Sequence, residues 1–219
     1  MPDLVDPRWI LHRSSELLVL NKPHGLLSQP GLGPHLADSL ISRVQLLWPQ
    51  AQLVHRLDRD TSGLILVALN PHLHRALSGL FAERRVSKRY VADVCGVPLQ
   101  RQGVIELPLA KRQHRPPLYG VDPAGKACST HWRLLEQGAR CSRLELEPRT
   151  GRSHQLRVHL QAIGHPILGD PLYGSIDAPH PAPSLERLHL HASALQWVQP
   201  FSGEPLAFEA PVPFSLPSP

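Results

Sequence analysis

Short apolar runs separated by polar turns recur along the chain and predict a series of β-strands. The run ELLVL at 16–20 ends in the Pro/Gly turn signal NKPHG, and the run GLILVAL at 63–69 is apolar throughout. A run without polar positions is typical of a strand that is buried on both faces, whereas alternation is typical of a half-buried strand. Further strands are expected at 88–96, 129–136, 142–148, 187–198 and 205–210.

Three other segments repeat their apolar residues at helical spacing and predict helices. These segments cover residues 40–48, 70–86 and 153–164. In the first, Asp38 or Ser39 can cap the start and Pro49 ends the pattern, while Asn70 is the expected N-cap of the second and Gly164 follows the third. The apolar stripe of the first helix comprises Leu40, Ile41, Val44, Leu47 and Trp48.

The order of these elements favours an α+β fold with a large mixed or mainly antiparallel sheet. Strands outnumber helices and mostly follow one another, which is not the alternation expected of a doubly wound sheet. We expect the 219 residues to form one domain of two packed halves, with residues 1–13 and 212–219 peripheral. The proline-rich end PVPFSLPSP is expected to fray.

Composition places the chain among ordinary soluble proteins. Hydrophobic residues make up 42% and charged residues 19%, and no apolar run approaches a membrane span. The N-terminus lacks the features of a signal peptide, so we expect a cytoplasmic location and no contact with a membrane. Cys95, Cys128 and Cys141 are odd in number and widely spaced, which favours reduced thiols over disulfides or a zinc site.

The net charge of +5 and the pI near 9.5 favour a polyanionic partner such as a nucleic acid. Motifs for other chemistries are missing, because the sequence has no P-loop, no GxSxG and no complete dinucleotide fingerprint. His154 and His159 are five residues apart and belong to no HExxH. We therefore expect no metal site.

Two stretches carry candidate chemistry: HRLDRDTSG at 55–63 and RTGRSHQLRVH at 149–159. The first can be a plain polar turn, and the second a solvated basic helix face. Alternatively, the first stretch holds the carboxylate of Asp58 at the edge of a buried strand, and arginines of the second pair with it or bind phosphates. The residues alone leave both interpretations open.

The sequence resembles the RluA-type pseudouridine synthases over nearly its whole length. Five blocks match in order: NKPHGLL from Asn21, HRLDRDTSGLILVA from His55, KRYVADVCG from Lys88, TGRSHQLRVHLQAIGHPILGDPLYG from Thr150 and LHLHASAL from Leu188. The segment PFSGEPLAFEAPVP is similar to the closing segment of the family. The resemblance implies the pseudouridine synthase fold and the isomerisation of uridine in RNA without a cofactor or metal.

The resemblance also implies roles for individual residues. Asp58 matches the catalytic aspartate, Tyr90 the tyrosine that stacks on the target base, and Arg157 the arginine that pairs with the aspartate. Leu190 is expected to wall the pocket, and Arg56 to fill or border the gap that the flipped uridine leaves. Candidate substrate contacts are His55, Arg56, Leu190, Lys22, Lys88, Arg89 and Arg152. Whether Asp58 attacks the sugar, attacks the base or removes a sugar proton stays open.

The expected substrate is a structured RNA and not DNA. Only about twenty residues precede the first block, too few for the S4-type RNA-binding domain of many relatives, so we expect the catalytic domain to find its target alone. We expect a monomer because no long exposed apolar stripe stands out in the sequence. Short members of the family modify a tRNA anticodon stem-loop and a loop of 23S rRNA. The same chemistry at another uridine, or an RNA-binding protein with secondary catalysis, remains an alternative. The proline-rich segment 112–127 departs from many relatives.

Overall fold

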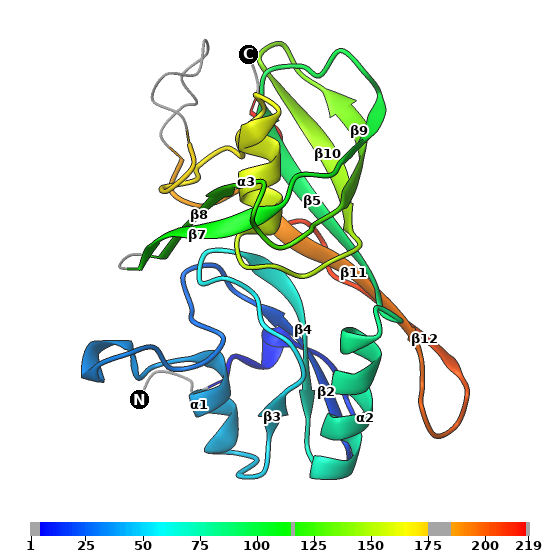
Figure 1. Ribbon diagram of the computed structural model, residues 1–219. Helices are drawn as coiled ribbons and strands as arrows, with labels where there is room; N and C mark the ends of the chain where they lie inside the picture. Colours follow the sequence, from blue (N-terminus) through cyan, green and yellow to red (C-terminus); the bar gives the residue numbers. More distant parts are fainter. Residues whose placement is uncertain (1–4, 115–116, 175–184, 218–219) are drawn as a thin grey trace. The chain divides into compact units, whose positions relative to one another are not determined.

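The computed structural model describes residues 5–114, 117–174 and 185–217. The chain divides into two compact units (Figure 1). The first unit comprises Met1–Lys88 and Ala192–Pro211, and the second comprises Arg89–His191 and Val212–Pro219.

The first unit is built on a sheet whose strands follow the order β1-β2-β4-β11. In addition β12 pairs with β11, and β3 pairs with β4. The bounds are β1 Ile10–Arg13, β2 Leu17–Lys22, β3 Gln52–Leu53, β4 Ser62–Ala68, β11 Leu190–Val198 and β12 Pro205–Glu209. Every residue of β4 is buried, as its unbroken apolar run predicts.

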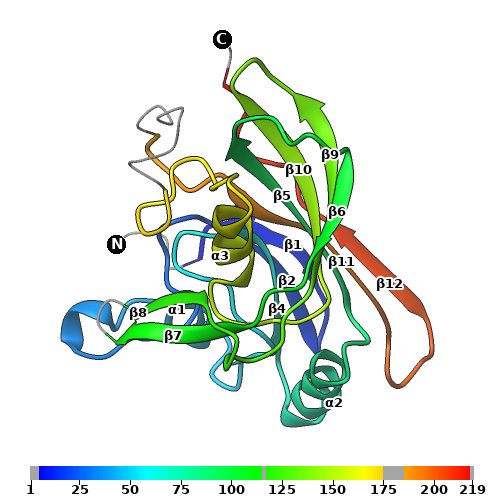
Figure 2. The same ribbon diagram turned by 45° about the horizontal axis from the view of Figure 1, so that its top comes forward.

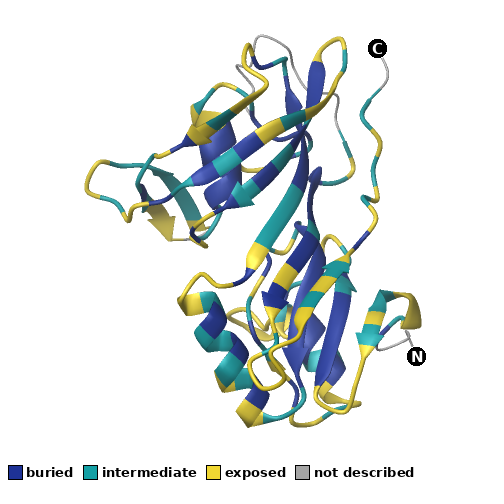
Figure 3. Ribbon diagram, turned by 90° about the vertical axis from the view of Figure 1, so that its right-hand side faces the viewer, coloured by how far each residue is buried: buried dark blue, intermediate teal, exposed yellow. Residues whose placement is uncertain are grey.

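Helix α2 of the first unit, Pro71–Ala82, confirms its predicted start. The side-chain oxygen of Asn70 accepts a hydrogen bond from the backbone N–H of Leu73 at 2.8 Å, and a proline occupies the first turn. The helix buries Leu73, Leu77 and Leu80, and the residues of its other face are exposed or half-buried (Figure 3).

Helix α1, Leu40–Gln45, is shorter than predicted. Ser39 is its N-cap and forms a capping box with Ser42. After Gln45 the backbone N–H of Leu47 bonds to the carbonyl of Val44, three residues back, which tightens the turn. Leu47 thereby leaves the apolar stripe and is 52% exposed, so its assignment to the buried face was wrong.

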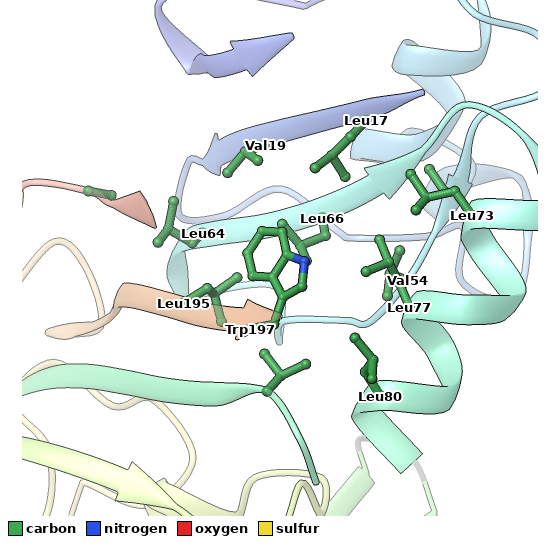
Figure 4. Packing of buried hydrophobic residues seen from close by; sticks show 13 residues of the cluster. Leu17, Val19, Val54, Leu64, Leu66, Leu73, Leu77, Leu80, Leu195 and Trp197 are labelled. Atoms are coloured by element: carbon green, nitrogen blue, oxygen red, sulfur yellow. The ribbon is translucent and has the colours of Figure 1, made fainter. Parts of the chain in front are cut away.

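The core of the first unit gathers around Trp197 of β11 (Figure 4). Side chains from β2, β4 and α2 surround the indole ring, so that residues far apart in sequence share one buried cluster. The buried members are Leu17, Val19, Val54, Leu64, Leu66, Ala68, Leu73, Leu77, Leu80, Val86, Leu195, Trp197 and Ala210.

The second unit contains strands in the order β5-β10-β9-β6 and a separate β7–β8 hairpin (Figure 2). The bounds are β5 Ser87–Cys95, β6 Gln102–Ile105, β7 Leu109–His114, β8 Pro117–Val121, β9 Thr130–Gln137, β10 Cys141–Pro148 and α3 Gln155–Ala162. Leu156 and Leu160 of α3 pack with Ala92 of β5 and Leu144 of β10 in one core cluster. Strands β5, β9 and β10 and helix α3 confirm the sequence predictions, and the fold is α+β.

Several elements were not predicted. The proline-rich segment 112–127 overlaps strands β7 and β8, which pair antiparallel. Residues 10–13, expected to be peripheral, form β1 and pair with β2. The C-terminal tail is docked where it is described: Arg143 donates to the carbonyl of Phe214 at 2.9 Å, and His189 stacks on the Phe214 ring. The expectation of fraying is therefore wrong for the described residues 212–217.

Candidate active site

The stretch that carries Asp58 is the connection between β3 and β4. At its start, the backbone N–H of Val54 bonds to the carbonyl of Leu66, and Nε2 of His55 accepts a hydrogen bond from the N–H of Leu66 at 3.1 Å. The His55 ring stacks on Phe81 of α2 with ring centres 4.4 Å apart. The connection is thus attached to the buried strand β4 before it reaches the aspartate.

Both neighbours of Asp58 are held by buried side chains from segment 22–28. The Ser28 hydroxyl donates to the carbonyl of Leu57 at 2.7 Å and accepts from its N–H at 3.1 Å. On the other side of Asp58, the Lys22 ammonium donates to the carbonyl of Arg59 at 2.9 Å. The NKPHGLLS segment therefore fixes the backbone that carries the half-buried Asp58.

Lys22 corrects one of our predictions. Its side chain is fully buried, and its ammonium also donates to the carbonyls of Pro23 at 2.8 Å and Leu26 at 2.7 Å. An ammonium has three N–H donors, and three backbone carbonyls accept from them. The prediction that Lys22 contacts the substrate is therefore wrong, because its buried ammonium donates to backbone carbonyls of the loop instead.

The contacts of His55 give it a structural role. Burial, with a smaller effect from the charge of Lys88, lowers the pKa of His55 to about 3. The imidazole is therefore neutral at physiological pH and accepts at Nε2. A direct contact between His55 and substrate stays a prediction.

In the second unit, the predicted basic helix face around Arg157 is buried. Every residue from 155 to 160 is buried, and Arg157 is 2% exposed. Its Nε and Nη2 donate to the two carboxylate oxygens of Asp170 at 2.8 and 2.7 Å, and its guanidinium lies over the Tyr173 ring, 4.9 Å from the centre. The solvated-face interpretation is wrong for α3.

Asp170 was not singled out from the sequence, although it fixes Arg157. Its Oδ1 also accepts from the backbone N–H groups of Leu172 and Tyr173, at 2.9 and 3.0 Å. A buried arginine requires a buried acidic partner. The only sequence signal for this partner was the Gly-Asp step in the block GHPILGD. Bidentate pairing leaves the guanidinium little freedom to rotate.

Gln155 anchors the Thr-Gly turn that precedes α3. Its Oε1 accepts from the Thr150 hydroxyl at 2.7 Å and from the N–H of Arg152 at 3.0 Å, while its Nε2 donates to Thr130 of β9. The helix begins after His154, which has a left-handed φ of 56°. The Gln155 Nε2 also donates to the carbonyl of Ser129 at 3.1 Å, and these four hydrogen bonds fix the start of the helix that carries Arg157.

Two further candidate residues, Tyr90 and Leu190, belong to the core of the second unit. Tyr90 is half-buried on β5, opposite Leu146 of β10, and packs on the core cluster that contains Leu190. Leu190 itself is 3% exposed at the start of β11. These contacts give Tyr90 a rigid support.

The candidate cations differ in their exposure. Arg56 and Arg152 are exposed, whereas Lys88 and Arg89 are half-buried. Arg89 lies 3.7 Å from the Glu145 carboxylate, which offsets part of its charge, and burial together with nearby Arg84 lowers the pKa of Lys88. Among the candidates for phosphate contacts, the exposed Arg152 is therefore favoured over Lys88 and Arg89.

The described part of the chain contains no group of three histidine, cysteine or acidic side chains that could hold a metal ion. It also contains no helix long and apolar enough to cross a membrane.

Comparison with known proteins identifies relatives along almost the whole chain. Residues 16–162 match the family described as RNA pseudouridylate synthase. The chain is 44% identical over 207 residues to the dual-specificity RNA pseudouridine synthase RluA of Escherichia coli K12, which covers 94% of the chain and 93% of that protein. It is 42% identical to the RluA of Yersinia pestis, over 94% of the chain and 99% of that protein.

Two solved human structures are similar in fold. Human RNA Pseudouridylate Synthase Domain Containing 1 gives a TM-score of 0.79 at 31% identity, covering 94% of this chain and 84% of that one. Human RNA Pseudouridylate Synthase Domain Containing 4 gives a TM-score of 0.77 at 26% identity, covering 94% and 89%. The comparison of sequences and the comparison of folds therefore identify the same family.

Proposed function

This chain belongs to the RNA pseudouridylate synthase family, and from that premise we propose that Asp58 is the carboxylate on which its reaction depends. The protein is an RNA pseudouridine synthase, an isomerase that acts on RNA. The reaction breaks the bond between C1′ of the ribose and N1 of uracil and joins C1′ to C5. The proton on C5 leaves and N1 gains one, so atoms and electrons balance without a redox partner.

The rigid backbone on either side of Asp58 is the observation that supports this assignment best. Leu57 is held by the Ser28 hydroxyl and Arg59 by the Lys22 ammonium. A group that must meet one atom of a flipped base gains from such fixed positioning. As a carboxylate, Asp58 can attack the sugar, attack the base or remove a sugar proton, and each route needs the same placement.

The resemblance assigns Tyr90 and Arg157 to the same site as Asp58. The resemblance assigns Arg157 as the partner of Asp58, and the pair with Asp170, which uses Nε and Nη2, supports a guanidinium held in one orientation. Tyr90 stacks on the uracil, with Leu190 as an apolar wall. Stacking on an aromatic ring returns about 1–3 kcal/mol per base, which offsets part of the cost of flipping the uridine.

For the targets, we propose a tRNA anticodon stem-loop and a loop of 23S rRNA, both modified by a monomer. The relatives that carry the words dual-specificity in their name support two RNA targets. The exposed Arg152 is the proposed phosphate contact, and the exposed Arg56 is proposed to fill or border the gap that the flipped uridine leaves.

The catalytic assignment is tested by the variant Asp58→Asn. We expect it to bind a stem-loop RNA with the affinity of the unmodified protein and to form no pseudouridine. Asp60→Asn is the matched control, because Asp60 is two residues away and pairs with Arg59. Normal pseudouridine formation by Asp58→Asn would disprove the assignment, and loss of RNA binding would indicate a role in binding instead.

The target assignment is tested by mapping pseudouridine in total RNA from cells that lack this gene. We expect loss at one anticodon stem-loop position and one 23S rRNA loop, and recovery on expression of the protein but not of Asp58→Asn. Loss at other uridines would overturn the proposed targets and leave the chemistry intact.

A further inference from the structure

Two of the three cysteines face each other across neighbouring strands. In the antiparallel pairing of β5 and β10, Cys95 lies directly opposite Cys141. Residues that are directly opposite point to the same face of the sheet. The two thiol groups therefore extend from the same side of the ladder.

The hydrogen bonds around the pair show that it occupies a non-hydrogen-bonded position. The next pair along is bonded, because the N–H of Gly96 donates to the carbonyl of Arg140 at 2.8 Å. The N–H of Cys95 donates instead to Pro166 at 2.9 Å, and the carbonyl of Cys141 accepts from Gly138 at 2.9 Å. Opposite Cα atoms at such positions are about 4.5 Å apart, within the range that a disulfide bridges.

The two thiols also share one environment. Cys95 and Cys141, which are 6% and 7% exposed, pack with Leu168, Leu185 and Leu216 in one apolar cluster. Burial raises the pKa of both, and the second-largest effect on Cys95 is the charge of Cys141. Cys128 belongs to a different cluster, where its Sγ lies 3.2 Å from the carbonyl of Lys126.

We propose that Cys95 and Cys141 are a site of reversible oxidation, at which a small-molecule disulfide converts the two thiols into an intrachain bridge. One thiolate attacks a sulfur of oxidised glutathione and releases one glutathione thiol. The second cysteine then attacks the mixed disulfide, which forms the Cys95–Cys141 bond and releases the second glutathione. The protein loses two electrons and two protons, and the oxidant gains them.

The bridge has two structural consequences. It joins β5 to β10 across a loop of roughly 45 residues, which restricts the unfolded chain and stabilises the fold. The bridge also removes the thiol hydrogen of Cys141. In the reduced chain this thiol donates to the carbonyl of Pro217, with Sγ and O 3.7 Å apart, so the C-terminal tail loses one contact.

The test is oxidation of the folded, full-length chain by oxidised glutathione, followed by thiol counting in denaturant and peptide mapping. We expect the count to fall from three to one, with a peptide that links Cys95 to Cys141, and dithiothreitol to restore all three. The midpoint of thermal unfolding should rise on the order of 5–10 °C in the oxidised chain.

Single variants provide the controls. Cys128→Ala should still lose two thiols, whereas Cys95→Ala and Cys141→Ala should form no intrachain bridge. If these two variants fail to fold, the proposal is tested by peptide mapping of the unmodified chain, which detects or excludes the peptide that links Cys95 to Cys141. Three thiols that persist in the native protein, stable glutathione adducts, or a bridge that includes Cys128 would each overturn the proposal.

Discussion

Ser28 is the single residue whose removal tests most directly how the loop positions Asp58. Ser28→Ala deletes both hydrogen bonds to Leu57 in a buried position, which should lower the free energy of unfolding by about 1–3 kcal/mol. Misplacement of Asp58 should lower kcat by about ten- to a hundredfold with little change in RNA affinity. Single-turnover assays on a stem-loop RNA separate the two effects.

Two variants serve as controls for the positioning role of Ser28. Ser28→Thr retains a hydroxyl and should recover most of the activity. Ser78→Ala, which removes a hydroxyl 3.5 Å from His74 on α2, should change neither kcat nor binding. If folded Ser28→Ala reacted at the normal rate, the hydrogen bonds to Leu57 would contribute stability alone.

His55 gives the protein a predictable dependence of stability on pH. Its pKa is lowered to about 3 in the folded chain, and in the unfolded chain it returns to about 6.5. The unfolded state therefore binds the proton first, so stability is complete above pH 6.5 and falls toward pH 3. The slope contributed by one proton is about 1.4 kcal/mol per pH unit.

Urea unfolding between pH 7 and pH 4 measures this slope. His55→Gln places an amide oxygen near the position of Nε2 and cannot take up the proton, so the slope should become shallower. It should not vanish, because burial also lowers the pKa of His159. Identical slopes in the two proteins would show that His55 titrates normally in the folded chain.

At the scale of single elements, the close approach of β4 and β11 depends on Gly63. This residue has φ +114°, and a Cβ atom there would lie 2.3 Å from the carbonyl oxygen of Ala192. Gly63→Ala should destabilise the protein by more than about 2 kcal/mol, because backbone atoms must move. Gly79→Ala is the matched control: nothing lies within 4 Å and α2 gains about 0.5–1 kcal/mol. Urea unfolding of both variants provides the measurement, and similar stabilities would contradict the close approach.

The elements that could be predicted from sequence are those whose stability is locally encoded. The Asn70 cap, the stripe on α2 and the unbroken apolar run of β4 can all be read directly. Strands β7 and β8 were missed because most of their residues are exposed or half-buried and show no clear apolar alternation. Helix α1 was extended too far because a tight turn after Gln45 imitates helical spacing.

The candidate site also contains residues that the sequence predicts and residues that it does not. Asp58, Tyr90 and Arg157 were singled out because their motifs are specific, but the residues that hold them were not. Ser28 acts on Leu57 across 29 positions, and Asp170 acts on Arg157 across 13. Such partners are chosen by the tertiary fold, so one sequence contains little signal for them.

At the scale of the whole molecule, the net charge of +5 must be divided between charges that RNA can reach and charges that the fold uses. Arg152 is exposed, whereas the charge of Lys22 is fully buried among carbonyl groups. Each phosphate contact contributes about 0.7–0.9 to the slope of log affinity against log salt concentration. The two residues should therefore differ in their effect on salt dependence.

We expect Arg152→Gln to lower the magnitude of that slope by about 0.7–0.9 and to weaken the binding of all stem-loop RNAs to a similar extent. Lys22→Met should leave the slope unchanged while it reduces stability by about 3–5 kcal/mol, because buried carbonyls lose a charged donor. Filter binding at several salt concentrations, restricted to the folded fraction measured by circular dichroism, makes the comparison. A shallower slope for folded Lys22→Met would mean that RNA reaches this ammonium, and an unchanged slope for Arg152→Gln would remove it from the phosphate contacts.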